Sequence, residues 1–163
     1  MCGFSFAIVY DLSESETIMK TLLKISAVLW IIWGLVHMLA GVMTVYGVFA
    51  GDLSVPISAI LDGVDPTILT ADYPAQLGGI LGQHGFNLFW FGLITLIAAF
   101  YIWNGNRNAI FMAAIVGGLA DLGYFIFIDL AGYAKFAPGT IMTIVSASAI
   151  ALSLYAHFKG QNE

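Results

Sequence analysis

Four long apolar segments, separated by short polar stretches, dominate the hydrophobic pattern of the chain. They are Ile25–Phe49, Phe86–Trp103, Ala109–Ile128 and Thr140–Phe158. The second extends back to about Leu77 through the sequence Leu-Gly-Gly-Ile-Leu. A helix needs about 20 apolar residues to cross the hydrocarbon core of a bilayer. The pattern therefore predicts an all-α, polytopic membrane protein, a bundle of four transmembrane helices over about 22–49, 77–103, 109–129 and 139–158.

The polar segments between these helices predict how they are connected. Asn104-Gly105-Asn106-Arg107-Asn108 is typical of a tight turn, so the second and third helices should form an antiparallel hairpin. The outer loop, residues 50–76, contains four aspartates and no basic residue. Its apolar stretch Val55–Leu61 is too short to cross a membrane and predicts a short helix lying on the outer surface. The spacing of the aspartates matches no EF-hand, which favours a solvated acidic loop over a calcium site.

Charge and composition agree with this class of protein. The chain is 60% hydrophobic and only 9% charged, against about 25% charged in soluble domains. The five basic residues are Lys20, Lys24, Arg107, Lys135 and Lys159. If both termini are cytoplasmic, all of them except Lys135 lie on the cytoplasmic side, which is the orientation that the positive-inside rule favours. We therefore expect a multi-pass protein of the cell (inner) membrane in contact with membrane lipids. The net charge of −5, with no basic cluster, argues against nucleic acid as a partner.

Residues 1–18 form an N-terminal extension ahead of a single transmembrane domain, 19–163. From Met19 the chain reads Met-Lys-Thr-Leu-Leu-Lys and then the first apolar run, which is how inner-membrane proteins commonly begin. We expect either that the native protein starts at Met19 or that the extension is a peripheral arm.

Small residues recur four apart in the last two segments, as in Ala113-xxx-Gly117, Ala114-xxx-Gly118 and Ala149-xxx-Ser153. This spacing lets helix backbones approach closely in a membrane. It is compatible with a compact bundle, a homo-oligomer or a subunit of a larger membrane complex.

Three ionisable residues are the candidate functional groups. An ionisable side chain inside a spanning helix costs about 2.5–3.5 kcal/mol on insertion scales, so each calls for an explanation. His37 lies at the middle of the first segment, Asp121 lies well inside the third, and His84 lies in the second if that helix starts near Leu77. The sequence thus predicts that three helices each place one titratable group at a similar depth in the outer half of the membrane.

Helical spacing adds neighbours to this predicted site. On the first helix Trp33 shares a face with His37. On the second helix Asn87 shares a face with His84, and Gln83 is the neighbour of His84 in the sequence. On the third helix Tyr124 shares a face with Asp121. Thr143 and Ser146 form a milder polar stripe on the last helix.

Three interpretations of the site are open. A histidine and Asp121 could form a buried hydrogen-bonded pair that fixes helix register and binds nothing. The site could instead bind a small lipophilic or quinone-like ligand, with proton exchange through His37 and Asp121 and with His84, Gln83 and Asn87 at the entrance. Finally, His37, His84 and Asp121 could bind a metal ion, since two histidines and a carboxylate are a sound ligand set. An accessory subunit without chemistry of its own is the rival class, and the sequence names no cofactor.

The arrangement resembles small four-helix bacterial membrane proteins of the DoxX-like kind. The similarity rests on the Trp33-Gly34-Leu35-Val36-His37 pattern of the first helix, the long first outer loop, the short basic inner turn and the Pro-Gly start of the last helix. It covers about residues 19–158. The resemblance implies a four-helix bundle, and some relatives are linked to thiol or quinone redox chemistry.

Overall fold

The computed structural model describes residues 3–69 and 71–160, with side chains from residue 14 onward. In that part of the chain the structure is helical, and four helices are long and apolar enough to cross a membrane, which confirms the predicted fold class at that level. They are α1 (Gly3–Phe49), α3 (Gln76–Trp103), α4 (Arg107–Tyr124, continued by the π-helical turn η2, Phe125–Asp129) and α5 (Ile141–Lys159, preceded by the turn η3, Phe136–Thr140).

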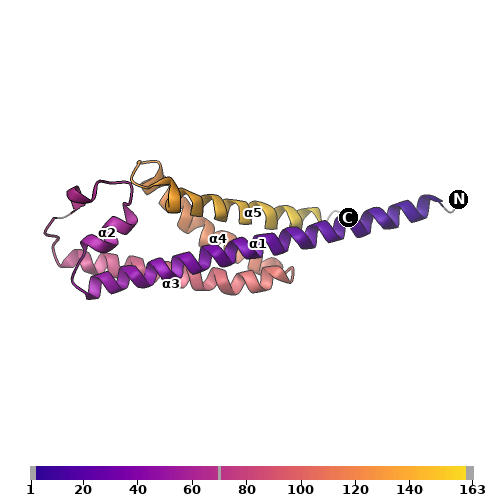
Figure 1. Cartoon of the computed structure of the whole chain (residues 1–163). Helices are drawn as coiled ribbons and strands as arrows, with labels where there is room; N and C mark the ends of the chain where they lie inside the picture. Colours follow the sequence, from indigo (N-terminus) through magenta and orange to yellow (C-terminus); the bar gives the residue numbers. More distant parts are fainter. Residues whose placement is uncertain (1–2, 70, 161–163) are drawn as a thin grey trace.

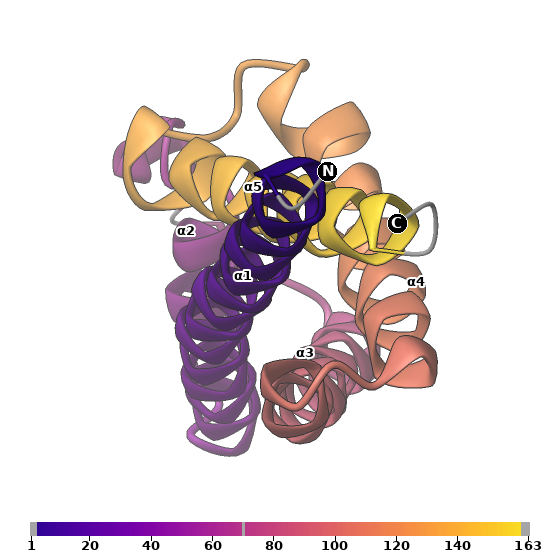
Figure 2. The same ribbon diagram turned by 90° about the vertical axis from the view of Figure 1, so that its right-hand side faces the viewer.

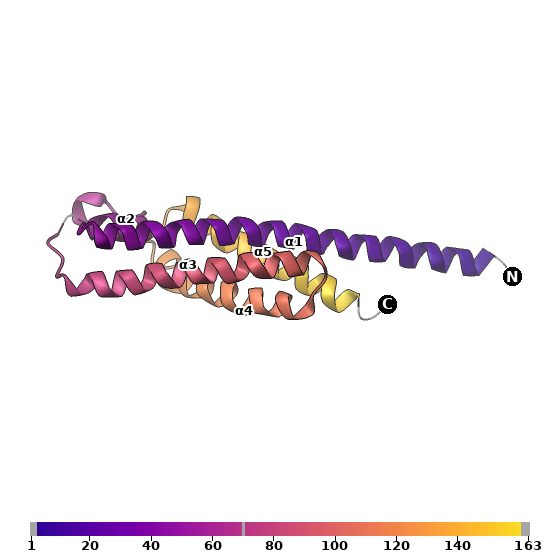
Figure 3. The ribbon, with the colours of Figure 1, turned by 90° about the horizontal axis from the view of Figure 1, so that it is seen from below.

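The four long helices lie alongside one another in an elongated bundle (Figures 1 and 3). One end of the bundle, the terminal end, carries the Asn104–Asn106 turn and the end of α5, and α1 extends beyond it (Figure 1). The opposite end, the loop end, carries residues 50–75 and 130–135. Helix α1 packs mainly against α3 and α5, and α4 packs against the same two helices, so α1 and α4 face each other across a diagonal (Figure 2).

Helices α1 and α3 share the most extensive interface, and glycines allow it. A Cβ atom on Gly34 would lie 2.8 Å from the carbonyl oxygen of Gly92, and one on Gly41 would lie 2.5 Å from that of Gly85. Each helix thus places glycines seven residues apart along one seam, the repeat that keeps contacts between two nearly parallel helix axes in register. The two backbones touch at these points.

The remaining core is built from small residues and tryptophan. Gly117 of α4 lies directly against the ring of Trp30, which is fully buried, and Gly118 lies against Ile150 of α5. The hydroxyl of Ser26 donates across to the carbonyl oxygen of Ala149 at 2.8 Å. The predicted small-residue positions Ala113, Gly117, Ala149 and Ser153 therefore pack inside the bundle, whereas Ala147 and Ala151, which have the same spacing on α5, are exposed.

The short helix predicted between the first two long helices is present as α2 (Ser54–Ile60), followed by the 3₁₀ turn η1 (Pro66–Leu69). Three of the loop aspartates accept hydrogen bonds from other loop residues. Asp52 accepts hydrogen bonds from the backbone and hydroxyl of Ser54, and Asp65 accepts the same pair from Thr67, which lowers the pKa of the Asp65 carboxyl. Asp62 accepts from the backbone N–H of Lys135 at 2.7 Å, which connects the loop between α1 and α3 to the loop between η2 and η3.

Helix boundaries follow the sequence pattern closely, with one large difference. Helix α3 begins at Gln76, as the longer interpretation of the second segment predicts, and Asn106 caps α4 by accepting from the N–H of Ala109 at 3.1 Å. Helix α1, expected from about residue 22, already begins at Gly3 and runs to Phe49 without a break. The extension therefore continues the first transmembrane helix instead of forming a separate element.

Candidate functional site

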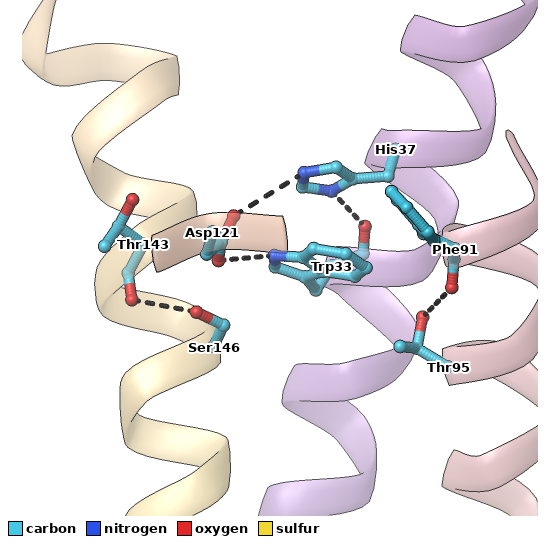
Figure 4. Close-up of polar contacts among 7 residues, drawn as sticks. All are labelled: Trp33, His37, Phe91, Thr95, Asp121, Thr143 and Ser146. Carbon is cyan, nitrogen blue, oxygen red and sulfur yellow. Dashed lines mark hydrogen bonds and ion pairs between the residues drawn. The ribbon is translucent and has the colours of Figure 1, made fainter. Parts of the chain in front are cut away.

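A buried hydrogen bond between Trp33 and Asp121 lies at the centre of the bundle. The indole Nε1–H of Trp33 on α1 donates to Asp121 Oδ2 on α4 at 2.7 Å (Figure 4). Trp33 is fully buried and Asp121 is only 4% exposed. Because α1 and α4 lie on a diagonal, this bond bridges helices whose backbones are not packed together. A charge-assisted bond in such a setting is among the stronger hydrogen bonds that a protein makes.

His37 completes a compact cluster of three side chains, which we call the Trp–His–Asp cluster. Its ring stacks on Trp33 with ring centres 3.6 Å apart. Its Nδ1 lies 2.9 Å from the carbonyl oxygen of Trp33, and its Nε2 lies 3.7 Å from Asp121 Oδ1. Both residues predicted to exchange protons therefore meet, as the sequence predicts.

A proton shared between His37 and Asp121 would make these atom positions favourable. The Trp33 carbonyl can only accept a hydrogen bond, so we assign the hydrogen of a neutral imidazole to Nδ1. Nε2 would then present a lone pair to Asp121, and two lone pairs repel when the carboxylate is ionised. One shared proton removes the conflict, either on His37 as an imidazolium or on Asp121 as a carboxylic acid. In both forms the pair has no net charge, which lowers the cost of burying it in a membrane.

Helix α5 adds hydroxyl groups to the same region. Ser146 is buried on the side of α5 that faces Asp121, and its hydroxyl donates to the carbonyl oxygen of Thr143 at 3.1 Å (Figure 4). The hydroxyl oxygen of Thr143 is buried and has no hydrogen-bond partner in the described part of the chain. Thr143, beside the Trp–His–Asp cluster, therefore has a hydroxyl group whose hydrogen bonds are unfilled.

The predicted entrance residues on α3 do not join this cluster. His84 is near enough to His37 to interact with it electrostatically, but His84 and Gln83 are both exposed on the helix surface. The side chain of Asn87 is half-buried and accepts from Trp90 Nε1–H at 3.0 Å. The reason is the register of the glycine seam: Gly41 lies opposite Gly85, which places His84 five residues, or about 7.5 Å, nearer the loop end than the part of α3 level with His37.

Tyr124 and the predicted metal set also differ from expectation. The Tyr124 hydroxyl packs against Gly139 near the loop end, one helical turn away from Asp121. Within residues 14–69 and 71–160, no three His, Cys, Asp or Glu side chains are grouped closely enough to hold a metal ion. The structure thus joins His37 to Asp121 but does not bring His84 in as a third ligand.

Ser146 is a member of the site that was not predicted as one. Its polar stripe on the last helix is visible in the sequence, but the spacing on one helix does not say which neighbour that stripe faces. The same limit explains why Trp33 could be placed beside His37 but not identified as the donor to Asp121.

The fold and the site define a class: an all-helical protein with four helices suited to spanning a membrane and a Trp–His–Asp cluster buried between them. Comparisons with protein-family models, curated proteins and solved structures give no match for this chain.

Proposed function

We propose that this is a multi-pass inner-membrane protein, with both termini cytoplasmic, that binds a small lipophilic, quinone-like ligand at the Trp–His–Asp cluster in a proton-linked manner. The observation that carries the proposal is the 3.7 Å separation of His37 Nε2 and Asp121 Oδ1, with His37 Nδ1 already engaged. At 3.7 Å these two atoms do not form a direct hydrogen bond, so a ligand oxygen can compete for a proton that they share.

The exposure of the two partners supports entry from the His37 side. The side chain of His37 is 14% exposed and that of Asp121 is 5% exposed. A quinone-like molecule offers a carbonyl oxygen that accepts from a protonated imidazole, and its flat ring can stack on aromatic side chains. The resemblance to DoxX-like proteins, some of which are linked to quinone chemistry, favours the same ligand class.

The basic residues support the orientation. Arg107 opens α4 and Lys159 lies in the last turn of α5, both at the terminal end, whereas Lys135 lies in the second outer loop at the loop end. The positive-inside rule then places the terminal end in the cytoplasm. In this orientation the loop end, with α2, faces outward.

Calorimetric titration of the purified full chain with decylubiquinone in mild detergent tests the proposal. The wild type should show one saturable site whose binding heat depends on the ionisation enthalpy of the buffer, because a proton is taken up or released. His37→Gln should weaken binding at least tenfold, and Asp121→Asn should remove the buffer dependence. His157→Gln, the same change near the end of α5, is the matched control and should bind as the wild type does.

Two results would overturn this proposal. The first is an absence of saturable binding by the folded wild type. The second is a stoichiometric partner chain that co-purifies with a protein that binds no quinone, which would identify an accessory subunit.

A further inference from the structure

An apolar groove runs along the outside of the α1/α3 pair, away from the Trp–His–Asp cluster. It has a volume of about 460 Å³ and is lined by Ile31, Leu35, Leu96, Ala99, Phe100 and Trp103. Its lining side chains are all apolar or aromatic, and its volume is in the range of small-molecule sites, about 300–1,000 Å³.

A single cation marks the terminal end of this groove. Lys24 Nζ lies 5.6 Å from the centre of the Trp103 ring, which also lines the groove. Lys24 is exposed and has no carboxylate partner in the described part of the chain, whereas Lys20, one turn earlier, is paired with Glu16 at 2.6 Å. The groove is therefore apolar along its length and positively charged at one mouth.

The length of the groove matches one leaflet of a bilayer. Lys24 and Leu35 are eleven positions apart on α1, which corresponds to about 16 Å at 1.5 Å rise per residue. The hydrocarbon core of a membrane is about 30 Å thick, so one leaflet contributes about half of that. With Lys24 and Trp103 at the headgroup level, where tryptophan is favoured, Leu35 lies near the middle of the membrane.

From this combination we infer that the α1/α3 groove is a binding site for an anionic phospholipid of the leaflet at the terminal end. One acyl chain lies in the groove from Trp103 to Leu35, and the headgroup phosphate binds the Lys24 ammonium. The inference depends on membrane insertion but not on the quinone-like ligand.

Native mass spectrometry of the full chain in mild detergent tests the site. The probe is an equimolar mixture of phosphatidylglycerol and phosphatidylcholine with the same acyl chains. The wild type should retain one phosphatidylglycerol in preference to phosphatidylcholine by about fivefold, the effect of one basic residue near a headgroup. Lys24→Gln should remove the preference, and Lys135→Gln, at the loop end, should keep it.

A second pair of variants tests the groove itself. Ile31→Trp fills the groove and should lower retention of the lipid, whereas Ile32→Trp, an exposed neighbour outside the groove lining, should leave retention unchanged. Equal retention of both lipids by the wild type would mean a nonspecific lipid annulus and overturn the inference. So would a wild-type dimer that Ile31→Trp alone disrupts, which would assign the groove to a second copy.

Discussion

Replacing Gly41 with alanine tests the glycine seam between α1 and α3. A Cβ atom at this position would lie 2.5 Å from the carbonyl oxygen of Gly85 and 2.6 Å from the backbone nitrogen of Phe89. Both atoms belong to the backbone of α3, so no side chain can rotate away. The two helices must separate, and the contacts next to Gly41 along the seam loosen with them.

The change in the free energy of unfolding expected for Gly41→Ala combines the destabilisation from overpacking with the higher helix propensity of alanine. Overpacking a well-packed interface costs about 1–3 kcal/mol, and rigid backbone on both sides puts Gly41→Ala at the upper end of this range. Alanine is favoured over glycine inside a helix by about 1 kcal/mol, which offsets part of the cost. We expect a net loss of about 2 kcal/mol in the free energy of unfolding.

Gly79→Ala is the matched control because it makes the same chemical change in α3. A Cβ atom on Gly79 would have nothing within 4 Å, and the residue is exposed. This variant should be as stable as the wild type or more stable by up to about 1 kcal/mol. Both variants can be compared by reversible unfolding in mixed micelles with increasing sodium dodecyl sulfate. If Gly41→Ala proves as stable as Gly79→Ala, the helices do not meet at this seam.

Two further predictions concern single hydrogen bonds. Asp121→Ala should lower the free energy of unfolding by about 1–3 kcal/mol, because it leaves the indole N–H of Trp33 buried without a partner. Asp121→Asn should lower the free energy of unfolding much less, since the amide oxygen accepts from Trp33 and the amide nitrogen can donate to His37 Nε2. Equal losses in the same unfolding assay would contradict the proton placement assigned above. Asn106→Ala should lower the free energy of unfolding by about 1 kcal/mol by removing the cap on the N–H of Ala109. Asn106→Asp keeps the acceptor oxygen and should be as stable as the wild type. An unchanged unfolding midpoint for the alanine variant would mean that the cap does not stabilise α4.

The helices could be predicted from the sequence because each depends on local information. Length and apolar composition predict the spanning segments, and Asn106 and Gly105 mark the tight turn between α3 and α4, where Gly105 has a φ of +76°. The early start of α1 at Gly3 could not be predicted, because the polar stretch Asp11–Thr17 separates the mostly apolar residues Phe4–Tyr10 from the first long apolar segment.

The site was predicted only in part, and the reason is the register between helices. Depth estimated from residue number was sufficient to predict that His37 and Asp121 meet. The exact register of two helices depends on which side chains pair across their interface. On α3 the pairing of Gly85 with Gly41 places His84 about 7.5 Å from the level of His37, nearer the loop end. Glycines seven apart on α1 and α3 are visible in the sequence, but their pairing with each other is not.

The glycine seam with α3 and the Trp33–Asp121 hydrogen bond with α4 together determine the orientation of α1. Between membrane helices no hydrophobic force distinguishes a protein neighbour from lipid, so close packing and polar bonds must select partners. The glycine seam fixes α1 against α3, and because Trp33 adjoins Gly34, it also points the indole toward the bundle axis. Across the diagonal, where α1 and α4 cannot pack backbone to backbone, Trp30 fills the space against Gly117 and the Trp33–Asp121 bond sets the register. A carboxyl group at the bundle axis thus orders the fold through one oxygen, Oδ2, and leaves the other, Oδ1, facing His37 Nε2 at 3.7 Å.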